Sequence, residues 1–423
     1  MIQTPQTKTL KNGLRIIHVP FPNLHSVSLK LMGRAGSSWE GLNETGVAHF
    51  LEHLSFEGTQ KYPSYDKLQG LLNDVGGQHN GYTSENTVAY LAKVLNEDLE
   101  KGLDYLSQIL IHPLIKQKDV EKHREIITQE ILMYEDKPVS KFFMDALKYI
   151  YPAGTRLQIP VIGTMDFVKK ATSEDIANFR LKHYFAKNFI LGIGSSLNSD
   201  EVFNKSEKFF GEMASGEQEN YLPIELPKDK IVYTQKSDKV QQTTVSIGYE
   251  GYNVYDKRKY AKNILADILG GNDLSRLFTK IRQELGLAYY VGCETSSVPS
   301  YGSIAVLVQL DRKNLETVLG IIKDELKQIS KNDVTDEEFN RSKKSVAASF
   351  AFDQENVENQ VNLYTKIALE GREEESYDSI LQNYLDVTKE DIKSTANELF
   401  SQNPKILVLS NQVANEDVEN FKL

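Results

Sequence analysis

The spacing of apolar residues divides the chain into short strands and helices of moderate length. Apolar or β-branched residues recur at every second position in 27–31 and 87–94, which is typical of strands with one buried face. They recur at every third or fourth position in 99–110 and 120–134, which predicts amphipathic helices. Strands separated by helices in large units indicate an α+β fold.

The same pattern recurs after about 216 residues. Thr172-Ser-Glu-Asp-Ile has the form of a capping box at a helix start, with Asp in place of the usual Glu, and aligns with Thr388-Lys-Glu-Asp-Ile. Three more pairs match at this offset: Val75-Gly76 with Val291-Gly292, Asp98-Leu99 with Asn314-Leu315, and Ile190-Leu191 with Ile406-Leu407. We therefore expect two homologous α/β-sandwich-like halves related by internal duplication; the alternative is one larger α/β domain in which the matches are coincidental.

A segment rich in Gly, Ser, Pro and acidic residues, 211–227, lies between the two halves. Such a composition is typical of a linker. We expect a first domain at 1–215, a linker at 216–227 and a second domain at 228–423. The length of 423 residues also favours two domains over one.

Composition restricts the class of protein. With 40% hydrophobic and 26% charged residues, the chain has the composition of a folded globular protein. Its net charge of −10, without a basic block, argues against nucleic-acid and anionic-membrane partners. The single cysteine, Cys293, excludes an internal disulfide and a cysteine-based metal cluster. Because the first residues lack a leader pattern and no apolar run approaches ~18 residues, we expect a cytoplasmic protein.

Two histidines and a glutamate interrupt an apolar helical stretch, in the order His49-Phe-Leu-Glu52-His53. On a helix, His49 and His53 lie one turn apart on one face, where both imidazoles can reach a zinc ion at ~2.0–2.1 Å. Glu52 lies beside this face, in the place of a general base. From the His and acidic counts, chance predicts about 0.02 occurrences of this pattern, so the motif is specific.

A catalytic zinc normally has three protein ligands and an open position, so a third ligand is expected on another element. Glu130 is the candidate, because it lies on a predicted helix among apolar neighbours. Those neighbours are Ile126, Ile127, Met133 and Tyr134. A carboxylate on a core-facing stripe requires a partner, and a cation is an effective one.

The repeat provides an internal control for this set. An offset of 216 pairs the four polar residues with apolar ones: Leu265 with His49, Ile268 with Glu52, Leu269 with His53, and Val346 with Glu130. If these positions face the interior in both copies, a metal explains why one copy is polar. We expect one half to bind the metal and the other to have a different role.

The inverted His-x-x-Glu-His motif, followed by Glu130 after 76 intervening residues, resembles that of the inverzincin metallopeptidases, which include pitrilysin, insulin-degrading enzyme and mitochondrial processing peptidase. The segments 46–59, 75–83 and 276–289 carry the resemblance further along the chain. At its length, the chain is similar to the short, processing-peptidase-like members. This resemblance implies that one zinc ion per chain is held by His49, His53 and Glu130.

The resemblance also implies an activity. It makes Glu52 the base that activates the zinc-bound water, and it makes Arg282 and Tyr289 of the metal-free half contacts of the substrate. The expected function is a zinc metalloendopeptidase that hydrolyses extended oligopeptides or unfolded segments. The alternative is a non-catalytic assembly subunit of a peptidase complex, a class that loses residues of the metal motif. This chain retains all of them.

One position departs from the family pattern. Members usually carry a second glutamate seven residues before the ligand glutamate, and here that residue is His123. Two helical turns place it on the face of Glu130, so we expect it to contact the metal site, as a neighbour of the ligands rather than as an accessory ligand.

The substrate is expected to bind as an added strand. An exposed sheet edge is predicted at Gly76-Gly77 and the strand-like 80–83, which comprises Asn80, Gly81, Tyr82 and Thr83. Main-chain hydrogen bonds at such an edge would hold a peptide with little demand on its sequence. The alternative is an ordinary glycine turn before a strand. The resemblance further implies that the metal half of one subunit faces the Arg/Tyr half of another, so a homodimer is the simplest assembly, with a heterodimer left open.

Overall fold

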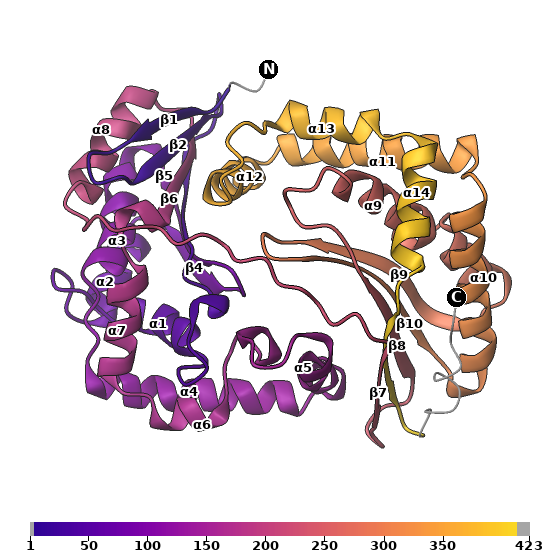
Figure 1. Ribbon diagram of the computed structural model, residues 1–423. Helices are drawn as coiled ribbons and strands as arrows, with labels where there is room; N and C mark the ends of the chain where they lie inside the picture. Colours follow the sequence, from indigo (N-terminus) through magenta and orange to yellow (C-terminus); the bar gives the residue numbers. More distant parts are fainter. Residues whose placement is uncertain (1–3, 413–423) are drawn as a thin grey trace. The chain divides into compact units, whose positions relative to one another are not determined.

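The computed structural model describes residues 4–412, which form two compact units (Figure 1). Unit 1 comprises the described residues up to 133 together with 154–220 and 351–375. Unit 2 comprises 134–153, 221–350 and the described residues from 376 onward. Each unit is built on one mixed sheet covered by helices, so the fold is α+β, as the alternation of strand and helix patterns predicted.

Unit 1 contains a six-stranded sheet in the order β1-β2-β6-β3-β5-β4. Its strands are β1 (Gln6–Thr9), β2 (Arg15–Pro20), β3 (Ser26–Gly33), β4 (Gln78–Thr83), β5 (Val88–Leu95) and β6 (Phe189–Ser195). The β2–β6 pair is parallel and the other pairs are antiparallel. Strand β4 forms one edge of this sheet.

Unit 2 repeats this arrangement in a five-stranded sheet with the order β7-β11-β8-β10-β9. The strands are β7 (Ile231–Lys236), β8 (Thr243–Glu250), β9 (Ala288–Ser297), β10 (Gly302–Leu310) and β11 (Lys405–Ser410). The parallel pair is β7–β11, the counterpart of β2–β6. Arg15 and Ile231, the first residues of β2 and β7, correspond at the offset of 216. Their partners in the parallel pairs are Ile190 of β6 and Lys405 of β11, so β6 and β11 correspond at an offset of 215, one less than the sequence alignment gives.

Helices cover the two stretches, 99–110 and 120–134, in which apolar spacing predicted them. Those of the first half are α1 (Val47–Ser55), α2 (Tyr65–Asn73), α3 (Leu99–Ile111), α4 (Gln117–Glu135), α5 (Pro138–Ile150), α6 (Met165–Lys170), α7 (Ser173–His183) and α8 (Ser199–Phe210). Those of the second half are α9 (Lys259–Ala266), α10 (Leu315–Lys331), α11 (Asp336–Gln354), α12 (Val357–Leu369), α13 (Tyr377–Asp386) and α14 (Lys389–Phe400). The predicted capping box at Thr172 is present, and Thr388 forms the same box with Asp391.

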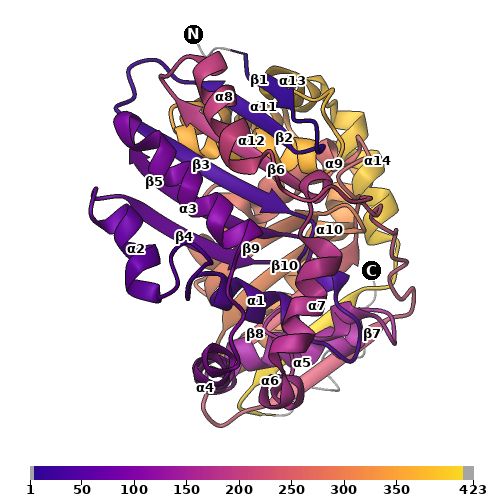
Figure 2. The same ribbon diagram turned by 90° about the vertical axis from the view of Figure 1, so that its left-hand side faces the viewer.

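Two corresponding helices each pack on the sheet formed by the other half of the sequence. Helix α12, from the second half of the sequence, packs on β6, β3 and β2 of unit 1, opposite the face that α3 and α8 cover (Figures 1 and 2). Glycine permits this close approach: a Cβ added at Gly192 would lie 2.1 Å from Thr365 Oγ1, and one at Gly194 would lie 2.3 Å from Val357 Cγ2. Helix α5, from the first half, packs on β7 and β11 of unit 2 through Phe142 and neighbouring residues.

The compact units therefore differ from the contiguous halves 1–215 and 228–423 that the sequence suggested. The chain passes from unit 1 to unit 2 at residues 220 and 221, inside the irregular stretch between α8 and β7. In addition, the segment 134–153 of the first half belongs to unit 2, and the segment 351–375 of the second half belongs to unit 1. The physical reason is that each exchanged helix buries its apolar face on the sheet formed by the other half of the sequence.

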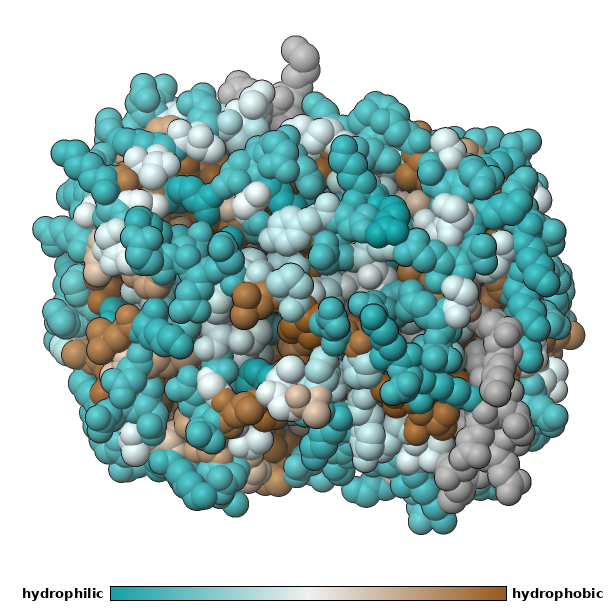
Figure 3. Space-filling model, in the orientation of Figure 1, coloured by the Kyte–Doolittle hydropathy of each residue, from teal (hydrophilic) through white to brown (hydrophobic). Residues whose placement is uncertain are grey.

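The surface is predominantly hydrophilic on the face drawn in Figure 3, with scattered hydrophobic side chains. In the described part of the chain, no helix combines the length and the apolar character that crossing a bilayer requires.

Candidate metal centre

Helix α1 holds both histidines of the motif, and a buried carboxylate fixes its first turn. Gly46, with φ of 99°, precedes the helix, and its N–H donates to Glu40 Oε2 at 2.8 Å. The N–H of Ala48 donates to Glu40 Oε1 at 2.9 Å. Arg156 Nε donates to the same carboxylate at 2.6 Å, which pairs its charge. A negative group at a helix N-terminus satisfies free N–H groups and complements the helix dipole, so Glu40 anchors the element that carries the site.

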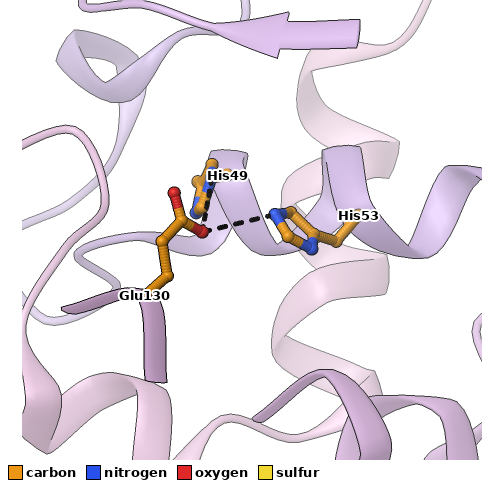
Figure 4. Close-up of side chains that lie close together, drawn as sticks. All are labelled: His49, His53 and Glu130. Atoms are coloured by element: carbon orange, nitrogen blue, oxygen red, sulfur yellow. Dashed lines mark ion pairs between the residues drawn. The ribbon is translucent and has the colours of Figure 1, made fainter. Parts of the chain in front are cut away.

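Three side chains from two helices converge (Figure 4). Nε2 of His49 lies 3.7 Å from Oε2 of Glu130, and Nε2 of His53 lies 3.8 Å from the same oxygen. The ligand atoms of all three lie within 4.8 Å of one another. Donors bound tetrahedrally to zinc at ~2.0–2.1 Å stand about 3.4 Å apart. The observed trio therefore requires only small side-chain adjustments to hold one zinc ion.

The electrostatics of the trio also fit a cation. Burial lowers the pKa of His49 to about 4 and that of His53 to about 3, so both imidazoles are neutral at pH 7 and each can offer a lone pair. Their separations from Glu130 exceed hydrogen-bond distance. Nδ1 of His49 is buried and has no hydrogen-bond partner among the described residues. Two lone pairs and a carboxylate that converge without bonding to each other form a donor set suited to zinc.

Glu130 is less buried than the apolar residues around it in the sequence predicted. Ile127 is buried, but Ile126 and Met133 are 42% and 44% exposed, and the Glu130 side chain is 28% exposed. Helix α4 buries the side that contains His123 and Ile127, and Glu130, two turns after His123, lies half-buried at the edge of that side. Glu130 is therefore less buried than predicted, and its assignment rests on its distances from the two histidines.

Glu52 is positioned as a buried carboxylate beside the trio. It is 8% exposed, and Thr83 Oγ1 donates to its Oε2 at 2.6 Å. Burial raises the pKa of Glu52 to about 7; the Thr83 hydrogen bond opposes this rise and the Glu130 charge adds to it. A carboxyl group with a pKa near 7 can both take up and release a proton at neutral pH. The sequence placed Thr83 on the substrate strand but gave no signal that it binds Glu52.

The predicted substrate residues fall into two parts. Gly76 and Gly77 form the turn between α2 and β4, where Gly76 has φ of 65°, so their local role is that of a glycine turn. Asn80, Gly81, Tyr82 and Thr83 lie on β4, at the open edge of the sheet and against α1. A Cβ added at Gly81 would lie 2.8 Å from the Phe56 ring and 3.2 Å from Glu52 Oε1. The backbone at Gly81 thus approaches Glu52 closely.

His123 contacts a member of the trio without belonging to it. Its Nδ1 lies 3.3 Å from Nδ1 of His53, the ring nitrogen that does not face Glu130. Its Nε2 lies 2.6 Å from Oε1 of Glu57. The sequence placed His123 near the site but missed Glu57. The available signal was its position four residues after His53, the spacing of neighbours on a helix face.

Arg282 and Tyr289 lie together in unit 2. Arg282 belongs to the π-helical segment η6 (Phe278–Glu284), and Tyr289 is 68% exposed at the start of β9. The Arg282 guanidinium lies 5.7 Å from the centre of the Tyr289 ring and 5.1 Å from that of Phe278. The apolar counterparts of the metal residues are also in unit 2; three are core residues, Leu265, Ile268 and Leu269, and Val346 is half-buried.

The raised pKa of Glu52 predicts a pH-dependent gain in stability for Glu52→Gln in metal-free protein. The folded wild type binds more protons than the unfolded chain between pH 4.5 and about 7, so it loses stability as pH rises through that window. Glutamine does not titrate. We therefore expect equal stabilities below pH 4.5 and a gain for the variant on the order of 3 kcal/mol above pH 7. Urea unfolding in chelator at pH 4 and pH 8 measures this difference, and equal stabilities at pH 8 would contradict the raised pKa.

Two models of known protein families match this chain. The model described as "Insulinase (Peptidase family M16)" matches residues 15–165, the segment that contains the trio and Glu52. The model described as "Peptidase M16 inactive domain" matches residues 170–346, the segment that contains the apolar counterparts.

Relatives of similar length match along nearly the whole chain. An "Uncharacterized zinc protease" of Rickettsia bellii is 29% identical over 405 residues, which cover 95% of this chain and 96% of the relative. The "Uncharacterized zinc protease YmxG" of Bacillus subtilis is 26% identical, covering 95% of this chain and 97% of the relative. The crystal structure of a protease from Helicobacter pylori has the same fold, with a TM-score of 0.88 at 22% identity, covering 97% of this chain and 100% of that one. The chain belongs to the M16 (insulinase) family of peptidases.

Proposed function

We propose that the protein is a zinc-dependent endopeptidase that hydrolyses extended oligopeptides or unfolded segments. The observation that carries the proposal is the convergence of His49, His53 and Glu130 beside a buried carboxylate, Glu52. The zinc protease names of the relatives support the metal and the general activity. One zinc ion per chain would be held by the trio.

The residues of this chain divide the work of peptide hydrolysis. A zinc ion held by the trio would acidify water and polarise the scissile carbonyl. Glu52 accepts the proton of the attacking water and delivers it to the leaving amine, because its buried carboxyl group lies on the same helix as the two histidines and burial raises its pKa above the ordinary value. Thr83 holds one oxygen of Glu52 through its hydroxyl and leaves the other for this exchange.

The edge strand β4 provides the substrate site. The Gly81 N–H donates to the Asn80 side chain at 2.9 Å, so it points away from β5. In an antiparallel ladder the N–H and C=O of one residue point to the same side and alternate along the strand. His79, Gly81 and Thr83 therefore present backbone groups at the open edge, where a peptide can add as a further strand once Asn80 yields its hydrogen bond. Main-chain pairing requires an extended substrate and gives little selection for its sequence.

Gly81→Ala should impair this site without removing the metal. The added methyl group would collide with Phe56 and approach Glu52 Oε1, which displaces either the base or the edge strand. We expect kcat/KM on an unstructured peptide to fall about tenfold or more, because small misplacements of reacting groups are costly. Zinc content should remain at the wild-type level. Gly70→Ala on α2, where a Cβ meets only Asp74 at 3.8 Å, is the matched control and should keep normal activity. Normal activity of Gly81→Ala would contradict the proposed strand site.

Metal analysis combined with a peptidase assay tests the proposal as a whole. Purified protein should contain one zinc per chain and cleave unstructured peptides internally. A chelator should abolish this cleavage, and added zinc should restore it. A protein that binds zinc yet cleaves no member of a diverse library of unstructured peptides would support a non-catalytic assembly subunit instead.

The roles of Arg282 and Tyr289, and a homodimer in which subunits share sites, are part of the same proposal. Both side chains can donate hydrogen bonds to the oxygen on which charge develops. Arg282→Ala and Glu52→Gln proteins, each nearly inactive, should regain activity when mixed if one subunit supplies the metal residues and another supplies Arg282. Absence of recovery despite measured subunit exchange would contradict shared sites.

A further inference from the structure

A line of three side chains leads from the metal trio to Glu57. His53 joins His123 through their Nδ1 atoms at 3.3 Å, and His123 joins Glu57 through Nε2 at 2.6 Å. The His123 and Glu57 side chains are only 9% and 8% exposed. With little water to substitute, each polar atom of this line depends on the next one for its hydrogen bond.

The chemistry of the end group sets the order of protons along the line. An ionised carboxylate only accepts hydrogen bonds, so Nε2 of His123 carries the proton shared with Glu57. An imidazole that carries one proton offers its other nitrogen as an acceptor, so Nδ1 of His123 can accept from Nδ1–H of His53. This leaves Nε2 of His53 without a proton. That atom is the one that faces Glu130.

We propose that Glu57 and His123 are positioning residues that fix the tautomer of His53, so that its Nε2 lone pair is held toward the metal position. This inference rests on the proposed role of the trio as a metal site. The reverse order of protons would place a hydrogen on Nε2 of His53 and block it as a ligand. It would also aim a lone pair of His123 at the carboxylate of Glu57.

A second group, Lys122, contacts Glu57 without reaching the line to His53. Lys122 Nζ donates to the same oxygen, Oε1, at 2.7 Å. Burial alone would raise the pKa of Glu57, but the hydrogen bonds from Lys122 and His123 outweigh it and hold this pKa below its ordinary value. Lys122 contacts Glu57 but takes no part in the line to His53, so it offers a matched control.

The tautomers can be observed directly in metal-free wild-type protein. Nitrogen NMR of histidine-labelled protein, with signals assigned by single substitutions, reports which ring nitrogen carries the proton. We expect the proton on Nε2 of His123 and on Nδ1 of His53. A proton on Nε2 of His53 would overturn the proposal. This experiment requires no variant that might disturb folding of the site and no peptidase activity.

Zinc affinity, measured by competition with a chelating indicator, tests the consequence. His123→Leu removes the acceptor of His53 and should weaken zinc binding 10-fold to 100-fold, the range typical for partners of metal ligands. His123→Gln should stay within about 3-fold of wild type, because its carbonyl can accept from His53 while its amide donates to Glu57. Glu57→Gln should weaken binding as well, since an amide can donate to His123 and so favour the wrong tautomer. Lys122→Met should bind zinc as wild type does.

Three outcomes would contradict the assignment. Wild-type affinity in His123→Leu would show that the line does not act on the metal site. Equal weakening in His123→Gln and His123→Leu would point to the imidazole itself as a ligand. Equal weakening in Lys122→Met and Glu57→Gln would point to the charge environment of Glu57 instead of proton order. Failure of the peptidase proposal alone would leave the tautomers and affinities as stated.

Discussion

Replacing Glu52 by glutamine is expected to reduce peptide hydrolysis by about 10²- to 10⁴-fold while zinc remains bound. Glutamine keeps the shape of the side chain and can still accept from Thr83, but it cannot take a proton from water. The loss should appear in kcat, because the group acts in the transition state. Steady-state kinetics and metal analysis on the same preparation provide the measurement.

The design of this experiment separates the base from general effects of charge. Glu125→Gln removes one negative charge from the exposed side of α4 and should retain wild-type kinetics. If Glu52→Gln also retained them, Glu52 would not be the base. If it lost zinc, Glu52 would be part of the metal site and the trio would be incomplete.

His49→Ala is expected to lower the zinc content from one per chain to nearly none and to abolish hydrolysis. Two remaining ligands, His53 and Glu130, hold zinc far more weakly than three. Elemental analysis after dialysis against metal-free buffer gives the stoichiometry. His25→Ala, which removes an exposed imidazole outside the site, should keep both zinc and activity. Stoichiometric zinc in His49→Ala would mean that the ligands are misassigned.

The sequence predicted the fold where local pattern determines it. Alternation identified β3 and β5, helical spacing identified α3 and α4, and two capping boxes mark the duplication. The exchange of α5 and α12 could not be predicted, because these helices occupy corresponding positions in the two halves. The sequence offset between the two helices is the same whether each helix packs on the sheet of its own half or on that of the other half.

In the site, too, residues close in sequence could be related to one another, whereas contacts made by tertiary packing could not. His49, Glu52 and His53 lie within one helix, so spacing alone relates them to one another. Glu130 was predicted to lie among buried apolar neighbours, but it lies half-buried at the edge of the one narrow side that α4 buries. The contacts of Glu57 and Thr83 depend on how α4 and β4 pack against α1, which no periodicity encodes.

The exchange of α5 and α12 limits how the protein can be divided. Cleavage or truncation in the stretch between α8 and β7 leaves an N-terminal fragment that lacks the cover of Gly192 and Gly194. The C-terminal fragment in turn lacks Phe142 over the strands β7 and β11. Each piece would expose an apolar sheet face and aggregate by itself. The two halves of this sequence, although copies of one pattern, each complete the core of the other.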